Sequence, residues 1–340
     1  MSRFPRRTGL AVALVLVALL VPSAAGATAG GQHSTGGQHS TGGRHSTVHR
    51  LVTGLAGGSG STIGPGGALY VTEPLAGRIS RVDPRTGAVT PYATGLPPRV
   101  IDVGGAMDVA FLGRTAYVLV TLVGPDVGGS AVVGLYRMDG PHTFTVVADI
   151  GAYAIAHPPD TAFFVPSGVQ YAMQTYRGGF LVTDGHHNRV LRVTRDGDIS
   201  VLAAFGNVVP TGLETRGGTV YMAQAGPVPH LPRDGRIAAF RAHGPDPRDV
   251  ATGGRLLVDV EFGRGHTLYA LAQGVFRPSD PEGAPAQPRT GKLLRVRHDG
   301  SFAVVAEHLD RPTSLELIRD TAYVVTLTGE IWTVDTYARR

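Results

Sequence analysis

The feature that most constrains this sequence is a repeat that recurs six times between residues 48 and 335. One apolar segment recurs as ALYVTE, TAYVLV, GFLVTD, TVYMAQ, TLYALA and TAYVVT, and a second as RISRVD, GLYRMD, RVLRVT, RIAAFR, KLLRVR and EIWTVD. Val82 and Val334 hold matching places in the first and last units and lie 252 residues apart, so each of the five periods has about 50 residues. A repeat of this length indicates one small structural unit used six times.

Each unit contains four short segments separated by turn residues. Turns such as DPRTG and RHDGS follow the second recurring segment, and inner segments such as PSGVQ, PTGLE and PTSLE precede the first. Four short strands with Gly, Pro and Asp between them form one antiparallel sheet, and six such sheets close into a ring. The sequence therefore predicts an all-β fold, a six-bladed β-propeller of four-stranded antiparallel blades.

The last unit lacks its outer strand. It ends soon after EIWTVD, which supplies only a third strand. Residues 48–55, VHRLVTGL, match the outer segments AVTPYATGL and FAVVAEHL of other units. We therefore expect this N-terminal strand to complete the sixth blade and close the ring, which leaves no long exposed strand edge.

The first residues have the order typical of an export signal. Arg3, Arg6 and Arg7 precede the apolar run LAVALVLVALLV, and the small residues SAAGA follow it. We expect residues 1–27 to be a signal peptide and the mature protein to begin near Thr28. The apolar run is shorter than the roughly 20 residues of a membrane span, and no later segment reaches that length. The protein is thus predicted to be secreted, with no membrane span after signal removal.

Residues 28–47 contain the hexapeptide GGQHST twice and GGRHST once. Gly, Ser and Gln bury little surface, so this stretch is predicted to be a flexible tether ahead of a propeller at 48–340. Neutral imidazole binds transition metals, but no ordering scaffold is visible around these side chains. The histidines of the tether are His33, His39 and His45.

Charge and cysteine content exclude several classes of function. The formal net charge of the chain is +5, and without the three arginines of the signal it is +2. A nucleic-acid-binding role therefore has no support from charge. The chain has no cysteine, which excludes disulfides, thiolate metal ligands and a cysteine nucleophile. We expect a monomer that is stabilised by its core alone.

Three stretches carry a resemblance to a known family: PSGVQ with GGFLVTDGHHNRVLRV, VPTGLETRGGTVYMAQAGPVPHLPRDGRIAAF, and LDRPTSLELIRDTAYVV. With them, residues 48–335 resemble the ScyD/ScyE family of exported bacterial proteins. That family is related in architecture to NHL-repeat and gluconolactonase-like propellers. The resemblance implies an exported propeller, and it implies no particular reaction.

The segment TDGHHNRV at 183–190 joins the second and third strands of the third unit, and NHL-type repeats carry a similar Asp, small residue and Asn-Arg-Val there. We expect Asp184 to accept backbone N–H bonds in the turn and Gly185 to supply the permissive backbone. His186 and His187 are adjacent, so they point in different directions on an extended backbone and do not easily share one metal ion. The segment is predicted to be a turn rather than a metal or catalytic site.

A second candidate site lies on the inner segments. Aligning PSGVQ, PTGLE, VDVEF and PTSLE places four side chains at equivalent positions near the central channel, namely Gln170, Glu214, Glu261 and Glu316. Carboxylate and amide oxygens are the ligands that Ca²⁺ or another hard divalent cation prefers. The resemblance to gluconolactonase-like propellers also implies a divalent cation at the channel mouth. The alternative is that these side chains point between blades and pair with Arg or with backbone N–H groups.

Two function hypotheses remain open. The first is a non-catalytic recognition or accessory module that binds a small molecule, glycan or protein through one face. The second is a divalent-cation-dependent hydrolase or lactonase with an acidic site at the channel mouth. No G-x-S-x-G motif supports a serine nucleophile.

Loop residues offer further candidates. Virginiamycin-lyase-type propellers need a His and a Glu over the channel, and His230 and His266 are candidates by loop position. Loops 124–130, 226–235 and 274–291 interrupt the repeat and are expected to carry ligand specificity, because a rigid ring lets its loops vary.

Overall fold

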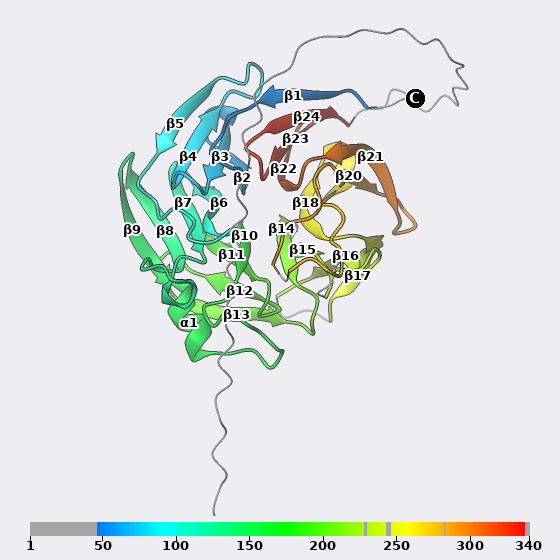
Figure 1. Cartoon of the computed structure of the whole chain (residues 1–340). Coiled ribbons are helices and arrows are strands. Elements are labelled where there is room, and N and C mark those ends of the chain that lie inside the picture. The colour runs from blue at the N-terminus through cyan, green and yellow to red at the C-terminus, as the bar shows by residue number, and fades with distance from the viewer. Residues whose placement is uncertain (1–45, 228–229, 243–245, 282, 337–340) are drawn as a thin grey trace, which may run out of the picture. The chain divides into compact units, whose positions relative to one another are not determined.

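Six four-stranded antiparallel sheets surround a central axis in the computed structural model (Figure 1). The described residues are 46–336, without 228–229, 243–245 and 282. The predicted signal peptide, the expected start near Thr28 and the three tether histidines lie outside them. Residues Arg44–Arg340 form one compact unit. The six-bladed propeller predicted from the repeat is confirmed.

The strands are numbered along the chain and fall into four positions in each blade. The inner strands of blades 1 to 6 are β2 (Ser61–Ile63), β6 (Gly105–Leu112), β10 (Gln170–Tyr176), β14 (Pro210–Arg216), β18 (Leu257–Phe262) and β22 (Pro312–Ile318). The second strands are β3 (Leu69–Glu73), β7 (Thr115–Thr121), β11 (Gly179–Asp184), β15 (Thr219–Gln224), β19 (Leu268–Ala272) and β23 (Thr321–Thr326).

The third strands are β4 (Arg78–Val82), β8 (Gly134–Gly140), β12 (Arg189–Val193), β16 (Gly235–Phe240), β20 (Gly291–Val296) and β24 (Ile331–Asp335). The outer strands are β5 (Val89–Ala93), β9 (Thr143–Asp149), β13 (Ile199–Ala204), β17 (Arg248–Gly254), β21 (Phe302–Leu309) and β1 (Val48–Val52). The helices are α1 (Ile150–Ala156) and the 3₁₀ turns η1 (Pro65–Gly67), η2 (Pro125–Val127) and η3 (Arg264–His266). No helix in the described part of the chain is long and apolar enough to cross a membrane.

The hydrophobic core lies between neighbouring blades. Second strands such as β3 and β11 are buried along their whole length, because each is covered by a blade on both faces. Outer strands such as β9 are mostly exposed. Tyr70 and Ile79 of blade 1 pack with Val118 of blade 2 in one of these cores. Each fully buried aliphatic or aromatic side chain stabilises the fold by roughly 1.5–3 kcal/mol.

Strand β1 closes the ring as predicted. It pairs antiparallel with β24, from Val48 opposite Val334 to Val52 opposite Ile331. Beyond the strand, the Leu55 N–H donates to the Gly329 carbonyl at 3.1 Å. Blade 6 therefore combines three strands from the C-terminal end of the chain with one from the N-terminal end.

The antiparallel order gives the ring two different faces. The start of each inner strand lies beside the end of the second strand, as Gly105 beside Thr121 and Gln170 beside Asp184 show. The loops that enter inner strands and the loops between second and third strands therefore share one face, which we call the upper face. The turns between inner and second strands lie on the opposite, lower face.

Candidate functional site

A cavity of about 300 Å³ occupies the upper part of the central channel. Loops of the upper face and side chains of the inner strands line it. Its apolar wall includes Met107, Tyr171 and Met173. Its polar lining includes five acids and two imidazoles, namely Asp102, Asp108, Asp259, Glu261, Glu316, His186 and His230.

The strand register tests the alignment of the inner segments. Glu214, Glu261 and Glu316 each lie opposite a tyrosine of the second strand, so they hold equivalent positions. Gln170 instead lies opposite Asp184, at the place that Pro210 holds in blade 4. Placing Gln170 with the three glutamates was therefore wrong.

The residue of blade 3 that matches the three glutamates is Gln174. It lies opposite Leu181, as Glu214 lies opposite Tyr221. The P-x-G pattern misleads because Pro210 is part of a ladder, whereas residues 166–168 form a turn before β10. Only the strand register of the folded structure shows that the P-x-G pattern is a turn in blade 3 and the start of a strand in blade 4.

Gln170 has a structural role. Its Oε1 accepts a hydrogen bond from the Thr121 hydroxyl at 2.7 Å. Its Nε2 donates to the Ser167 carbonyl at 3.1 Å and to Asp184 Oδ1 at 3.0 Å. Because its amide is saturated and buried, Gln170 is not available to a ligand in the channel.

Asp108 and Asp259 belong to the same channel but were not predicted. Each lies two residues before the glutamate position of its strand, and each accepts two backbone N–H bonds. Asp108 accepts from Val109 at 2.8 Å and from Met173 of the next blade at 2.7 Å. Asp259 accepts from its own strand and from Leu315 of the next blade in the same way. The shared Asp-Val in MDVAF and VDVEF is the sequence signal that marks them.

The channel acids have little positive charge near them. Arg99 is the single Lys or Arg side chain among the described residues that line the cavity. Burial raises the pKa of Asp108 well above its usual range, and it raises the pKa of Asp259 to about 7. Burial and the neighbouring carboxylates also raise the pKa of Glu261 and of Glu316 well above the ordinary value. Without a ligand, some of these acids hold protons at neutral pH.

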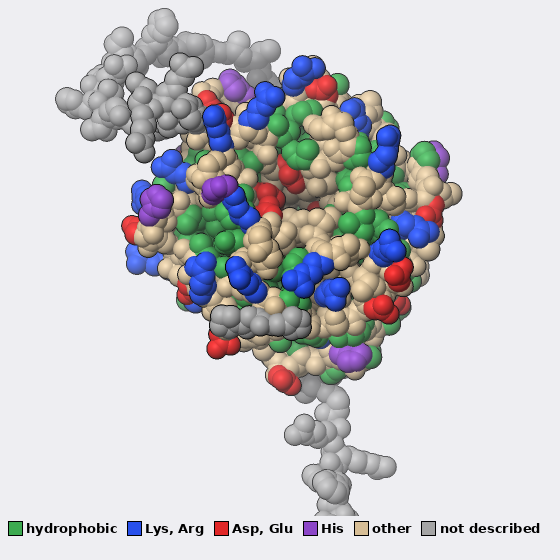
Figure 2. All heavy atoms as spheres, turned by 180° about the vertical axis from the view of Figure 1, so that it is seen from behind, with side chains coloured by type: hydrophobic (Ala, Val, Ile, Leu, Met, Phe, Trp, Pro, Cys, Tyr) green, Lys and Arg blue, Asp and Glu red, His purple; other side chains and the backbone are tan. Residues whose placement is uncertain are grey.

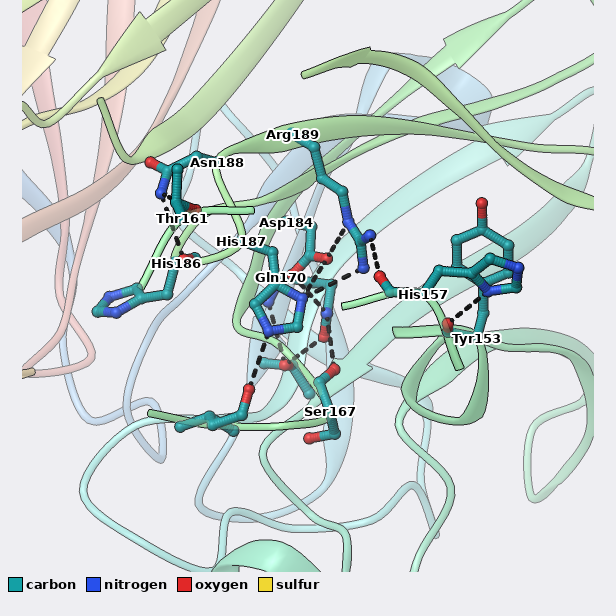
Figure 3. A network of polar contacts seen from close by, with 12 residues as sticks. Tyr153, His157, Thr161, Ser167, Gln170, Asp184, His186, His187, Asn188 and Arg189 are labelled. Atoms are coloured by element: carbon teal, nitrogen blue, oxygen red, sulfur yellow. Dashed lines mark hydrogen bonds and ion pairs between the residues drawn. The ribbon is translucent and has the colours of Figure 1, made fainter. Parts of the chain in front are cut away.

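The paired histidines have separate roles, as Figure 3 shows. His187 is buried, with Nδ1 3.1 Å from Asp184 Oδ2 and Nε2 3.0 Å from the Val165 carbonyl. His186 points away from it and lines the cavity, with Nε2 3.2 Å from the Tyr171 hydroxyl. The prediction that the two rings diverge is confirmed, and one of them faces the cavity rather than serving only the turn.

The turn itself is built differently from the expectation. Asp184 accepts from side chains, including Arg189 Nε at 2.8 Å, and not from the backbone of the turn. Asn188 adopts the left-handed backbone, with φ of 54°. Gly185 is required for space instead, because a Cβ there would lie 2.5 Å from the Tyr171 ring.

His230 and His266 lie at opposite ends of the channel. His230 lines the cavity, and its Nδ1 lies 2.8 Å from the Gly226 carbonyl. The residue is only 8% exposed. Burial lowers the pKa of both His230 and His186, the latter to about 4, so both imidazoles are neutral at physiological pH. His266 lies on the lower-face turn η3, away from this cavity.

Solved structures with the same architecture include several enzymes. A gluconolactonase from Xanthomonas campestris shares 12% identity over 85% of this chain and 89% of its own, with a TM-score of 0.60. A virginiamycin B lyase from Staphylococcus aureus shares 12% over 85% of this chain and 98% of its own, with a TM-score of 0.53. A PQQ-bound aldose sugar dehydrogenase from Streptomyces coelicolor shares 14% over 85% and 98%, with a TM-score of 0.55.

The likeness shows the fold alone. No protein-family model matches the chain, and no curated protein does. At identities this low, the activities of these propellers say nothing about which side chains act in this one.

The acids do not form a preorganised metal site. No group of three or more His, Asp or Glu side chains in the described part of the chain is arranged to hold a metal ion. Two of the channel acids are committed to backbone N–H groups, and Glu214 Oε1 accepts from the Thr215 N–H at 2.5 Å. None of the residues predicted to hold a cation, Glu214, Glu261, Glu316 and Gln170, belongs to such a group in that part of the chain.

Proposed function

We propose that this protein is an exported recognition module of ScyD/ScyE type that binds a small molecule in the upper cavity. The observation that carries the proposal is the lining of that cavity. It combines acids that lack Lys or Arg partners with the neutral imidazoles of His186 and His230 and an apolar wall. Polar groups shielded from bulk water favour a ligand that can form hydrogen bonds with them.

The lining also indicates the chemistry of the ligand. Carboxyl groups donate and accept hydrogen bonds with hydroxyls, and in the ionised form they attract a positive charge. The neutral imidazole of His230 offers an acceptor at Nε2. Met107, Tyr171 and Met173 provide a surface for an apolar body. A small polyhydroxy compound or amine with an apolar part fits this combination.

Export is part of the same proposal. The signal pattern at residues 1–27 supports it. The modest charge left after signal removal supports a role without nucleic acid.

Mass spectrometry of the purified mature protein tests the proposal. Small molecules released on denaturation are identified from the wild type and from the double variant Glu261→Gln/Glu316→Gln. The control is Glu307→Gln, an exposed acid that lies 3.4 Å from Lys292. We expect one compound to be released by the wild type and the control and lost from the double variant. Identical release from all three proteins contradicts binding in the cavity.

A second candidate function is hydrolysis, of a lactone for example. Glu261 and Glu316 have raised pKa values because of burial, and a protonated carboxyl can donate a proton. The neutral imidazole of His186 can accept one. These are the two proton transfers that lactone opening by water requires.

Turnover assays separate the two functions. A panel of sugar lactones and aryl esters is incubated with the wild type and with His186→Gln, each with chelator and with added Ca²⁺. Turnover that His186→Gln abolishes favours the hydrolase. Binding without turnover favours the recognition module. Stoichiometric calcium in the purified protein, lost together with thermal stability on chelation, would restore the cation-dependent alternative.

A further inference from the structure

The lower face carries an arginine at or beside the turn between inner and second strand in five of the six blades. Each lies in the turn between inner and second strand or at the end of the inner strand that enters it. They are Arg114, Arg177, Arg216, Arg264 and Arg319. Figure 2 shows this face, with Lys and Arg side chains gathered around a hollow in which acidic side chains are visible. We call these five residues the arginine ring.

The turns themselves do not require arginine. Arg177 and Arg319 have left-handed backbones, with φ of 47° and 59°. Two-residue hairpin turns of this kind favour Asn, Asp or Gly at such positions, because a larger side chain is strained there. Arginine at these places therefore costs hairpin stability and needs another explanation.

Most of the ring is free of acidic partners. Arg264 lies 3.3 Å from Asp320, and no other member forms an ion pair with an acid among the described residues. Arg216 lies over the Phe262 ring at 5.0 Å and donates to His266 Nε2 at 3.0 Å. Arg177 lies over the Tyr176 ring at 5.1 Å. Aromatic stacking restricts these guanidinium groups and leaves most of their N–H donors unused.

We propose that the arginine ring binds an acidic polysaccharide. Guanidinium groups bind carboxylates in a bidentate way, and a ring of them presents several sites to a flexible chain of uronate residues. Such a chain can follow the circumference and avoid the acidic hollow at its centre. This surface is separate from the upper cavity, so the inference does not depend on the function proposed for that cavity.

Two other anionic partners fit this face less well. None of the exposed large apolar side chains of the described residues lies in the inner turns, so nothing on the ring inserts into a bilayer. A flat anionic membrane would also meet the acidic hollow. Single-stranded nucleic acid binds by stacking bases on free aromatic rings, whereas Tyr176 and Phe262 are covered by arginines.

Fluorescence anisotropy with a labelled oligogalacturonate tests the proposal on the mature protein. The test variant is Arg114→Gln/Arg177→Gln/Arg319→Gln, three ring members without acidic partners. The control is Arg85→Gln/Arg192→Gln/Arg195→Gln, which removes the same charge from exposed positions outside the ring. We expect affinity to fall about tenfold or more in the test variant, since three charge contacts are lost together. The control should bind nearly as the wild type does.

Two further ligands distinguish the acidic polysaccharide from a membrane and from single-stranded nucleic acid. The same proteins are tested with phosphatidylglycerol vesicles and with a single-stranded DNA oligonucleotide. Preference for either over the oligogalacturonate overturns the proposal, as does equal loss in the test and control variants or no binding by the wild type. If the test variant melts below the control, the triple Arg→Lys substitution at the same positions is used instead. We expect it to keep the charge, weaken binding by less than the Gln variant and restore the melting temperature.

Discussion

Two sets of buried or half-buried carboxyl groups in this ring follow opposite rules. The hairpin acids Glu73 and Asp184 hold equivalent places at the ends of β3 and β11. Each binds the arginine opposite it, with Glu73 Oε1 2.8 Å from Arg78 Nε and Asp184 Oδ2 2.8 Å from Arg189 Nε. The channel acids Asp108, Asp259, Glu261 and Glu316 have no such partner.

Electrostatics separates the two sets. Burial acts to raise the pKa of Glu73, but hydrogen bonds from Arg78, Ser80 and the Ala56 N–H outweigh it and lower the pKa. Burial of the channel acids meets no comparable compensation, so their pKa values rise. Burial alone thus says little about the role of an acid. Acids with an arginine partner hold strands of their own blade together. Asp108 and Asp259 link neighbouring blades, and Glu261 and Glu316 are left for a ligand.

The largest effect is expected from Asp184→Asn. It leaves the Arg189 guanidinium, whose side chain is 4% exposed, without its carboxylate. Removing one member of a buried ion pair typically costs about 3–5 kcal/mol. Urea denaturation at pH 7 measures the loss. A cost below about 1 kcal/mol would show that His187 and Gln170 hold the network without the charge.

Glu73→Gln should cost less, about 1–2 kcal/mol, because the Arg78 side chain is 34% exposed and can turn to water. The same denaturation experiment measures it. A loss equal to that of Asp184→Asn would mean that exposure of the arginine does not distinguish the two hairpins.

The channel acids should respond to pH in the opposite direction from Glu73. An acid whose pKa is raised on folding binds its proton more tightly in the folded state than in the unfolded state. The free energy of unfolding therefore falls as the pH rises from about 4 through the pKa of the folded state, which is about 7 for Asp259. The double variant Glu261→Gln/Glu316→Gln removes part of this dependence. We expect it to be as stable as the wild type at pH 5 and about 1 kcal/mol more stable at pH 8.

Chemical denaturation across pH 4–9 checks this prediction, with Glu307→Gln as the exposed control. A double variant that loses stability at pH 8 would mean that the channel acids are compensated after all, for instance by a bound cation. The hairpin acid Glu73 should behave in reverse, with its contribution lost as the pH falls through its lowered pKa.

The smallest effect is expected from Asp249→Asn. Asp249 Oδ2 lies 3.2 Å from Arg236 Nη1, and both side chains are nearly half exposed. Such pairs contribute at most about 0.5 kcal/mol, so the melting temperature should stay nearly unchanged. A clear loss would weaken the contrast between buried and exposed acids on which the larger predictions depend.

Much of the fold could be predicted because its signals are local and repeated. Alternating apolar segments and Gly, Pro and Asp turns identify strands, and six copies identify blades. The pairing of β1 with β24 also followed from the sequence, since only one spare outer segment was available for one incomplete blade.

The candidate site could be predicted only in part. Glu214, Glu261 and Glu316 were found because their neighbours repeat, but Gln170 was confused with Gln174 because PSGVQ ends where β10 begins, whereas PTGLE lies inside β14. A register shift moves side chains to other places without changing the motif. Asp108 and Asp259 were missed because their role, to link neighbouring blades, exists only between strands far apart in sequence.

The sequence by itself determined the strands, the blade number, the closing partner and the opposite directions of His186 and His187. Each of these depends on residue order, strand period or turn chemistry within one unit. Only the tertiary structure decided which imidazole meets the cavity, which acids lack a counter-charge and which arginines share one face. Those properties depend on which loops and strands of different blades lie side by side, and closing the ring brings together residues that the sequence keeps about 50 positions apart.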